Sequence, residues 1–176
     1  RAVQAVQAVC DLPLQLDTSD PAALERALRI YNGRPLINSV NGGKESMSAV
    51  FPLARKYGAA VVALTLDEGG IPPTAAGRIA IAEKILATAR TYGLSEQDLI
   101  VDALAMTVST GPDNAAVALE TLDYVRHRLG IQTVLGVSNI SFGLPRREKI
   151  TAAFFTLAMG RGLSAGIVNP GEAAIM

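Results

Sequence analysis

Residues 59–102 read AAVVALTLDEGGIPPTAAGRIAIAEKILATARTYGLSEQDLIVD and contain one complete repeat of a recurring pattern. An apolar run at 59–66 is followed by a helical pattern at 75–92 and by a second apolar run at 99–101. Short runs of near-continuous hydrophobicity are typical of strands that are covered on both faces, as in parallel sheets. A strand, a helix and another strand in this order predict a parallel βαβ unit.

The same alternation extends in both directions along the chain. Apolar runs predict strands at 14–16, 35–37, 59–66, 99–101, 133–137 and 165–168. Helical spacing predicts helices at 1–9, 21–30, 46–57, 75–92, 114–129 and 147–161. A glycine closely follows each of the last five helices, as expected where a helix ends in a left-handed residue. The predicted order is therefore a helix, five βα units and a final strand.

Two architectures use such units, the (β/α)₈ barrel and the open doubly wound sheet. The doubly wound sheet is disfavoured because no strand is followed by a G-x-G-x-x-G or P-loop sequence. The nearest glycine-rich turn, residues 41–44, lacks the P-loop spacing. We therefore predict a partial TIM barrel with about six of its eight strands, the first two being absent. Residues 1–176 are expected to form one domain, a fragment of a larger barrel.

The composition excludes several classes of function. Sixteen basic and sixteen acidic residues give a net charge of +0, which removes the electrostatic argument for binding nucleic acid or anionic membranes. One cysteine, Cys10, and one histidine, His127, cannot supply a Cys-rich or His-rich site, and we expect the chain to bind no metal. No apolar run reaches the length of a membrane span, so a cytoplasmic protein is expected.

A polar side chain ends each predicted strand. In a barrel, all carboxyl ends of the strands lie on one face, where such enzymes place their sites. A carboxylate or amide at the rim of an apolar barrel is costly to desolvate unless it has a partner. The six residues at these positions are Asp17, Asn38, Asp67, Asp102, Asn139 and Asn169.

A ring of Asp and Asn offers hydrogen-bond donors and acceptors but no nucleophile. It suits a flat heterocycle with many polar edges, because carboxylates pair with an amino group and a ring N–H while amides address carbonyls and ring nitrogens. A pterin fits this description. For any one residue, capping of the following helix is an equally good explanation. Asp17 illustrates both interpretations, because Thr18, Ser19 and Asp20 can also cap the next helix.

Four motifs in the same order resemble those of the pterin-binding methyltransferases: Leu16-Asp17-Thr18, residues 37–41, Ile100-Val101-Asp102 and residues 136–141. Residues 64–72 and 142–147 resemble the same family. The likeness is greatest to the methyltetrahydrofolate-binding barrel of cobalamin-dependent methionine synthases. It is weaker to the methyltransferases of corrinoid iron–sulfur proteins and weaker again to dihydropteroate synthases.

The resemblance implies a reaction, in which the methyl group of 5-methyltetrahydrofolate passes to a cob(I)alamin or other corrinoid carried by another module or partner. Asp17, Asn38 and Asp102 match the positions that bind the pterin ring, and Asn139 matches the asparagine near the methyl-bearing N5. Further candidates for the site are Asp67, Ser141, Arg146 and Asn169. A homocysteine-binding module is a further implied partner, as in methionine biosynthesis.

Other interpretations stay open from the sequence. The resemblance also allows a dihydropteroate-synthase-like enzyme, and a non-catalytic folate-binding or structural barrel module is the alternative from another class. The sequence departs from the family pattern in lacking the first two strands and in reading Asp102-Ala103-Leu104 where Asp-Pro-Leu is common. Basic residues near strand ends could attract the glutamate tail of a folate, although solvated helix starts explain them better; they are Lys44, Arg78, Arg146, Arg147 and Lys149.

Overall fold

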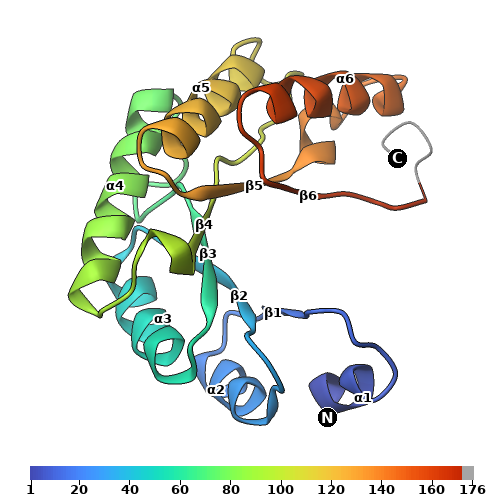
Figure 1. The fold of residues 1–176 in the computed structure, drawn as a ribbon. Coiled ribbons are helices and arrows are strands. Elements are labelled where there is room, and N and C mark those ends of the chain that lie inside the picture. The colour runs from blue at the N-terminus through green and yellow to red at the C-terminus, as the bar shows by residue number, and fades with distance from the viewer. Residues whose placement is uncertain (172–176) are drawn as a thin grey trace.

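Six parallel strands form one sheet in their order along the chain (Figure 1). The computed structural model describes residues 1–171 of the 176-residue chain. The strands are β1 (Gln15–Asp17), β2 (Leu36–Asn41), β3 (Ala60–Leu64), β4 (Leu99–Asp102), β5 (Gln132–Gly136) and β6 (Ala165–Ile167). The helices are α1 (Ala2–Gln7), α2 (Pro21–Ile30), α3 (Lys44–Tyr57), α4 (Ala75–Thr91), α5 (Asn114–His127) and α6 (Arg147–Gly160). Short 3₁₀ helices, η1 (Glu96–Asp98) and η2 (Val137–Ser141), precede β4 and follow β5.

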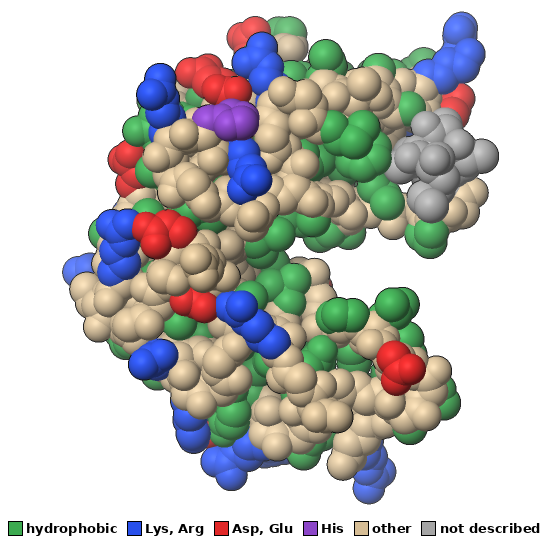
Figure 2. Space-filling view, viewed as in Figure 1, with side chains coloured by type: hydrophobic (Ala, Val, Ile, Leu, Met, Phe, Trp, Pro, Cys, Tyr) green, Lys and Arg blue, Asp and Glu red, His purple; other side chains and the backbone are tan. Residues whose placement is uncertain are grey.

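The sheet is curved, and helices α2 to α6 lie along its convex side (Figure 1). Sequential strand order with the helices on one side is the winding of a barrel, whereas a doubly wound sheet carries helices on both faces. The molecule is therefore a half-barrel. We call β1 and β2 with α2 and α3 the first arm, and β4 to β6 with α5 and α6 the second arm. Figure 2 shows the hollow on the concave side between these two arms. The longest helix, α4, has 17 residues, and no helix in the described part of the chain is long and apolar enough to cross a membrane.

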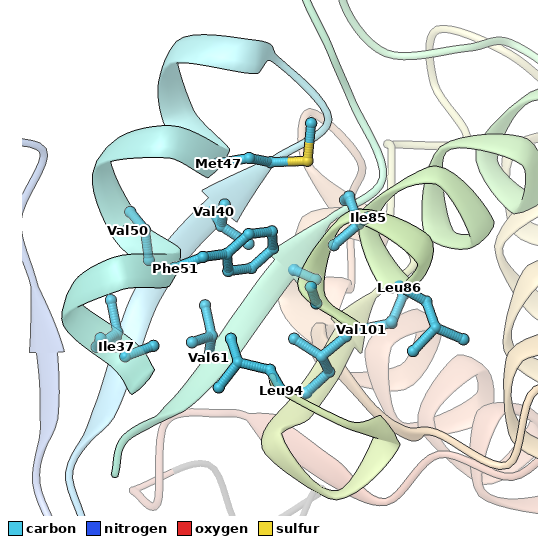
Figure 3. Packing of buried hydrophobic residues seen from close by; sticks show 14 of the residues in the cluster. Ile37, Val40, Met47, Val50, Phe51, Val61, Ile85, Leu86, Leu94 and Val101 are labelled. Carbon is cyan, nitrogen blue, oxygen red and sulfur yellow. The ribbon is translucent and has the colours of Figure 1, made fainter. Parts of the chain in front are cut away.

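The layer between the sheet and the helices holds the main apolar core. Side chains of β2, β3 and β4 meet those of α3 and α4 there (Figure 3). Phe51 of α3 is fully buried in this cluster and packs against the ring of Tyr92 with the ring centroids 5.7 Å apart. A second cluster joins the end of β4 and β5 to α5 and α6, around Leu122 and Leu135. Both clusters lie between the sheet and the helices and stabilise the curved sheet from its convex side.

The element types agree with the sequence prediction, and the boundaries differ by a few residues. Helix α2 matches its predicted range, whereas α3 begins at Lys44, two residues before the predicted start. Strand β2 continues through Asn41, so that Asn38 lies within the strand and does not follow it. Gly58 ends α3 in the left-handed conformation, at φ 64°, as predicted for a glycine after a helix.

Candidate functional site

Three of the predicted pterin-binding residues lie on the concave face of the sheet. Side chains alternate between the two faces of a strand, and residues paired across parallel strands share a face. Asp17 pairs with Asn38, and Asn38 pairs with Val62, which follows the core residue Val61 and points to the opposite, concave side. Asp102 lies two residues beyond Ile100, the partner of Val62, and so shares this face. The fold thus brings these polar groups to one surface.

Asp17 and Asn38 are in direct contact. The Asn38 amide Nδ2 donates to Asp17 Oδ2 at 3.3 Å. The pairing of β2 with β3 skips Ser39, and this bulge lies next to Asn38. A hollow of about 430 Å³ opens between the ends of β1 and β2 and the first turns of α2 and α3, and it includes Asp17 and Asn38 but not Asp102 or Asn139.

Asp102 ends β4 in a buried place, with 9% of its surface exposed. Its carboxylate Oδ1 accepts the amide N–H of Leu104 at 2.8 Å. Its backbone carbonyl accepts the Thr65 hydroxyl at 2.9 Å. Burial raises the pKa of the Asp102 carboxyl to about 6, against the opposing effects of the Leu104 amide and the positive charge of Arg78. The group can therefore be ionised at neutral pH and accept two hydrogen bonds from a ligand.

Arg78 of α4 is a component of this region that the sequence analysis assigned to a solvated helix start. It is only 1% exposed, and all its hydrogen bonds go to backbone carbonyls. Nε donates to Pro72 O at 3.0 Å, and Nη1 donates to Ala103 O at 2.8 Å and Leu104 O at 2.7 Å. Leu104 itself is left-handed, at φ 59°, which costs about 1–3 kcal/mol for a residue other than glycine.

Asn139 lies beyond β5, within η2, and is exposed. Gly136 ends β5 two residues after Val134, which pairs with Asp102, so its side-chain position faces the concave side. A Cβ atom at Gly136 would lie only 2.9 Å from Asn139 Nδ2. The Asn139 amide therefore covers the concave-face position at the end of β5, on the same side of the sheet as Asp102.

Among the described residues, the contacts of the four further candidate residues are mostly local and do not join them to Asp17, Asn38 or Asp102. The carboxylate of Asp67 accepts Gly69 N–H at 2.9 Å and the side chain of Asn169 accepts Gly171 N–H at 3.0 Å, so each stabilises its own turn. Ser141 is buried, and its hydroxyl contacts the Thr151 hydroxyl at 2.9 Å. Arg146 is exposed at the start of α6, in the left-handed region at φ 52°.

Arg147, the neighbour of Arg146, is also exposed, but its side chain is held by several contacts. Its Nε donates to the Ser141 hydroxyl at 3.2 Å, and its Nη2 donates to Ser138 O at 3.1 Å. Its guanidinium lies over the Phe142 ring, 4.5 Å from the ring centroid. These contacts stabilise the segment that carries Asn139, so the second arginine of the pair is part of the scaffold of the site.

Helix capping, the alternative explanation for the strand-end residues, is supplied by other side chains. Asp20 Oδ1 accepts Ala22 N–H at 2.9 Å at the start of α2, and Thr74 Oγ1 accepts Gly77 N–H at 3.2 Å at the start of α4. Glu68 reaches from the β3–α4 loop to accept Lys44 N–H at 2.9 Å at the start of α3. In residues 1–171, Asp17, Asn38, Asp102 and Asn139 cap no helix through their side chains.

The arrangement provides two carboxylates and two amides on one open concave surface. Within the described residues, no group of three or more His, Cys, Asp or Glu side chains is placed to hold a metal ion. Carboxylates accept hydrogen bonds from amino and ring N–H groups, and amides can both donate and accept. The surface is therefore suited to binding and orienting a polar heterocycle.

Comparisons with known proteins identify the family. The family described as pterin binding enzyme matches residues 1–169. The methionine synthases of Mycobacterium tuberculosis and Mycobacterium leprae are 34% and 33% identical over 171 and 174 residues. These matches cover 90% and 92% of this chain but only 14% of each relative. A methylcorrinoid:tetrahydrofolate methyltransferase of Eubacterium limosum is 29% identical over 168 residues, covering 94% of this chain and 62% of that protein.

Solved structures of dihydropteroate synthases from Vibrio fischeri and Yersinia pestis have the same fold. Their TM-scores are 0.71 and 0.72, with 17% and 18% sequence identity. Each match covers 98% of this chain, and 67% and 71% of the respective synthase. At this identity the likeness concerns the fold alone. With its parallel half-barrel and a family match over residues 1–169, the chain belongs to the pterin-binding enzymes.

Proposed function

We propose that this chain is the folate-binding part of a methyltransferase that moves the methyl group of 5-methyltetrahydrofolate to a cobalt(I) corrinoid. The observation that carries the proposal is the placement of Asp17, Asn38 and Asp102 on one concave face of the parallel sheet. Sequence similarity to a methionine synthase and to a methylcorrinoid:tetrahydrofolate methyltransferase supports the reaction class.

The donors and acceptors on this face match the polar edge of a pterin. In this proposal the Asp102 carboxylate accepts from the pterin amino group and ring N–H, and its buried surroundings would strengthen that pairing. The Asp17 and Asn38 side chains, already in contact with each other, would bind a second edge of the ring. Their fixed positions lower the entropic cost of orienting the substrate.

Asn139 is assigned to the N5 side of the folate. A neutral tertiary amine is a poor leaving group, and a proton or a strong hydrogen bond at N5 makes it a better one. The amide of Asn139 does not titrate at neutral pH, so its role is to hold a water or to stabilise the protonated amine by accepting its hydrogen bond. The corrinoid, carried by another module or partner, supplies the nucleophile that accepts the methyl group.

The test uses the intact gene product. It is mixed anaerobically with cob(I)alamin and 5-methyltetrahydrofolate, and the corrinoid spectrum is followed. Conversion to methylcobalamin that is lost in Asn139→Ala supports the proposal. Folate binding without conversion contradicts methyl transfer and favours another pterin reaction or a binding role. Failure to bind folate at all contradicts the assignment of Asp17, Asn38 and Asp102 to the pterin.

The acceptor of the methyl group in a complete reaction is homocysteine in our proposal, reached through modules outside this chain. The chain spans 14% of the methionine synthases that it resembles, so these modules are implied by the relatives and not by the residues described here. Addition of homocysteine to the spectroscopic assay tests this point, because turnover would restore the cobalt(I) spectrum after methylation.

A further inference from the structure

Arg78 is connected to Asp102 through a single peptide group. The carbonyl of the Ala103–Leu104 peptide accepts from Arg78 Nη1 at 2.8 Å. The N–H of the same peptide donates to Asp102 Oδ1 at 2.8 Å. The guanidinium and the carboxylate therefore bind opposite ends of one amide plane, and neither appears as a partner of the other in a direct ion pair.

We propose that Arg78 is a positioning residue that orients and polarises this peptide so that Asp102 is held ready to bind the pterin. The inference rests on the function proposed above. A cationic donor on a peptide carbonyl strengthens the hydrogen bond made by the N–H of that peptide, because the two bonds polarise each other. The carboxylate is thereby fixed in direction without being neutralised by a direct contact.

The surrounding geometry supports this assignment. Arg78 also donates to Leu104 O at 2.7 Å and so holds both carbonyls that flank the left-handed Leu104. Its Nε donates to Pro72 O at 3.0 Å, which joins the β3–α4 loop to the end of β4. Arg78 is only 1% exposed, so water does not compete with the carbonyls for its guanidinium. A solvated arginine at a helix start would bind water and would not need three carbonyl partners.

The electrostatics point in the same direction. The positive charge of Arg78 and the Leu104 N–H both lower the pKa of Asp102, opposing the larger effect of burial. Arg78 is the charged group in the described part of the chain that acts on this carboxyl. Its removal should therefore raise the pKa of Asp102 and weaken the binding of a cationic or N–H donor edge.

The test compares Arg78→Gln and Arg78→Lys with the wild-type protein in two measurements. The first is a ¹³C NMR titration of the Asp102 carboxyl, identified by its loss in Asp102→Asn; this needs no ligand. We expect the titration midpoint to rise in Arg78→Gln, and to rise less in Arg78→Lys, which keeps the charge but not the fork of donors. An unchanged midpoint in a folded Arg78→Gln protein overturns the inference.

The second measurement is the dissociation constant for 5-methyltetrahydrofolate. Arg78→Gln should weaken binding about tenfold or more, and in an Asp102→Ala background it should add less than about twofold, because the two residues act through one another. Equal effects in both backgrounds overturn the inference. Absence of folate binding in the wild type contradicts the proposed function instead, and the titration still decides the role of Arg78.

Arg34→Gln is the matched control. Arg34 also joins two chain segments, donating to Gln97 O at 3.3 Å and Asp98 Oδ1 at 2.8 Å, but at the amino ends of the strands. It should leave both the Asp102 titration and folate affinity unchanged. If Arg78→Gln fails to fold, both measurements are made on the Arg78→Lys protein.

Discussion

Asp102 changes its charge in a range of pH close to neutrality. Its pKa of about 6 in the folded protein lies above the value of 3.8 for an exposed aspartate, because burial disfavours the charged form. Between about pH 4 and about pH 6, Asp102 is therefore protonated in the folded state and ionised in the unfolded state. The contribution of this group to stability is present at low pH and falls by about 3 kcal/mol as pH rises from below 4 to above 6.

The same titration predicts the pH dependence of folate binding. Only the carboxylate form accepts two hydrogen bonds, so affinity should be constant above about pH 7 and fall up to about tenfold per unit below pH 6. Dissociation constants measured by calorimetry from about pH 5 to about pH 8 would show this pH dependence. Asp102→Asn should show weaker binding without this component, and an identical pH profile in both proteins would remove Asp102 from the site.

Gly136→Ala tests the position of Asn139 without changing that residue. The added Cβ would lie 2.9 Å from Asn139 Nδ2, and the amide must move, while the backbone at φ −74° tolerates alanine. Since a misplacement of about 1 Å in a positioning group can cost about 100-fold in rate, we expect Gly136→Ala to slow methyl transfer by up to about 100-fold. Single-turnover transfer to cob(I)alamin measures the rate.

The control for this substitution is Gly160→Ala, at the end of α6, where an added Cβ meets no atom within 4 Å. It should leave the rate unchanged. If Gly136→Ala and Asn139→Ala act on the same contact, the double variant should be little slower than either single one. A fully additive double variant would mean that Gly136 matters for a different reason.

For single residues, the sequence predicted where a side chain lies in the fold better than it predicted the hydrogen-bond partners of that side chain. Asp17, Asn38 and Asp102 share one face of the sheet, and the sequence predicted that they lie on one side of the fold because they end apolar runs in successive parallel strands. Arg78 was misplaced, although it precedes the buried Ile85 by seven residues and so lies on the apolar side of α4. Two of its three carbonyl partners, Ala103 and Leu104, come from the segment after β4, which is distant in sequence, and no helical pattern contains that information.

Among the elements, α2 and α5 offer a matched pair of helix starts. Asp20 accepts Ala22 N–H at the start of α2, whereas Asp113, at the corresponding position of α5, makes no side-chain cap. Asp20→Ala should lower the free energy of unfolding by about 1 kcal/mol, and Asp113→Ala should lower it by much less. Denaturant titrations measure both, and equal losses would show that the Asp20 bond does not stabilise α2.

Element boundaries were predicted where local signals set them. Helix α2 begins with Asp20 and Pro21, a cap and a first-turn proline that are both visible in the sequence. Helix α3 begins two residues earlier than predicted because Glu68, from another loop, binds the N–H of Lys44. The bulge in β2 depends on its pairing with β3, so the sequence alone placed Asn38 after the strand. Non-local contacts account for both differences.

For the whole molecule, the predicted half-barrel is confirmed, since six strands lie in chain order with the helices on the convex side. The same arrangement divides the candidate site residues between the two arms of the half-barrel. Asp17 and Asn38 belong to the first two strands, while Asn139 follows the fifth. A ligand that contacts all of them must therefore connect the first strands of the sheet with the fifth.

This separation predicts how folate should change the dynamics of the intact protein. A bound folate should slow amide exchange at the ends of both β1–β2 and β4–β5, because it adds contacts to each arm. At about 100 times the dissociation constant, binding stabilises the native state by about 2.7 kcal/mol, or about 100-fold in exchange rates limited by global unfolding. Hydrogen–deuterium exchange with mass spectrometry measures it, with the segment around Arg34 as the reference for locally exchanging amides, since it lies at the opposite edge of the sheet. Protection confined to one arm would mean that the pterin is bound by that arm alone, and the residues of the other arm would then have to act on the reaction without holding the substrate.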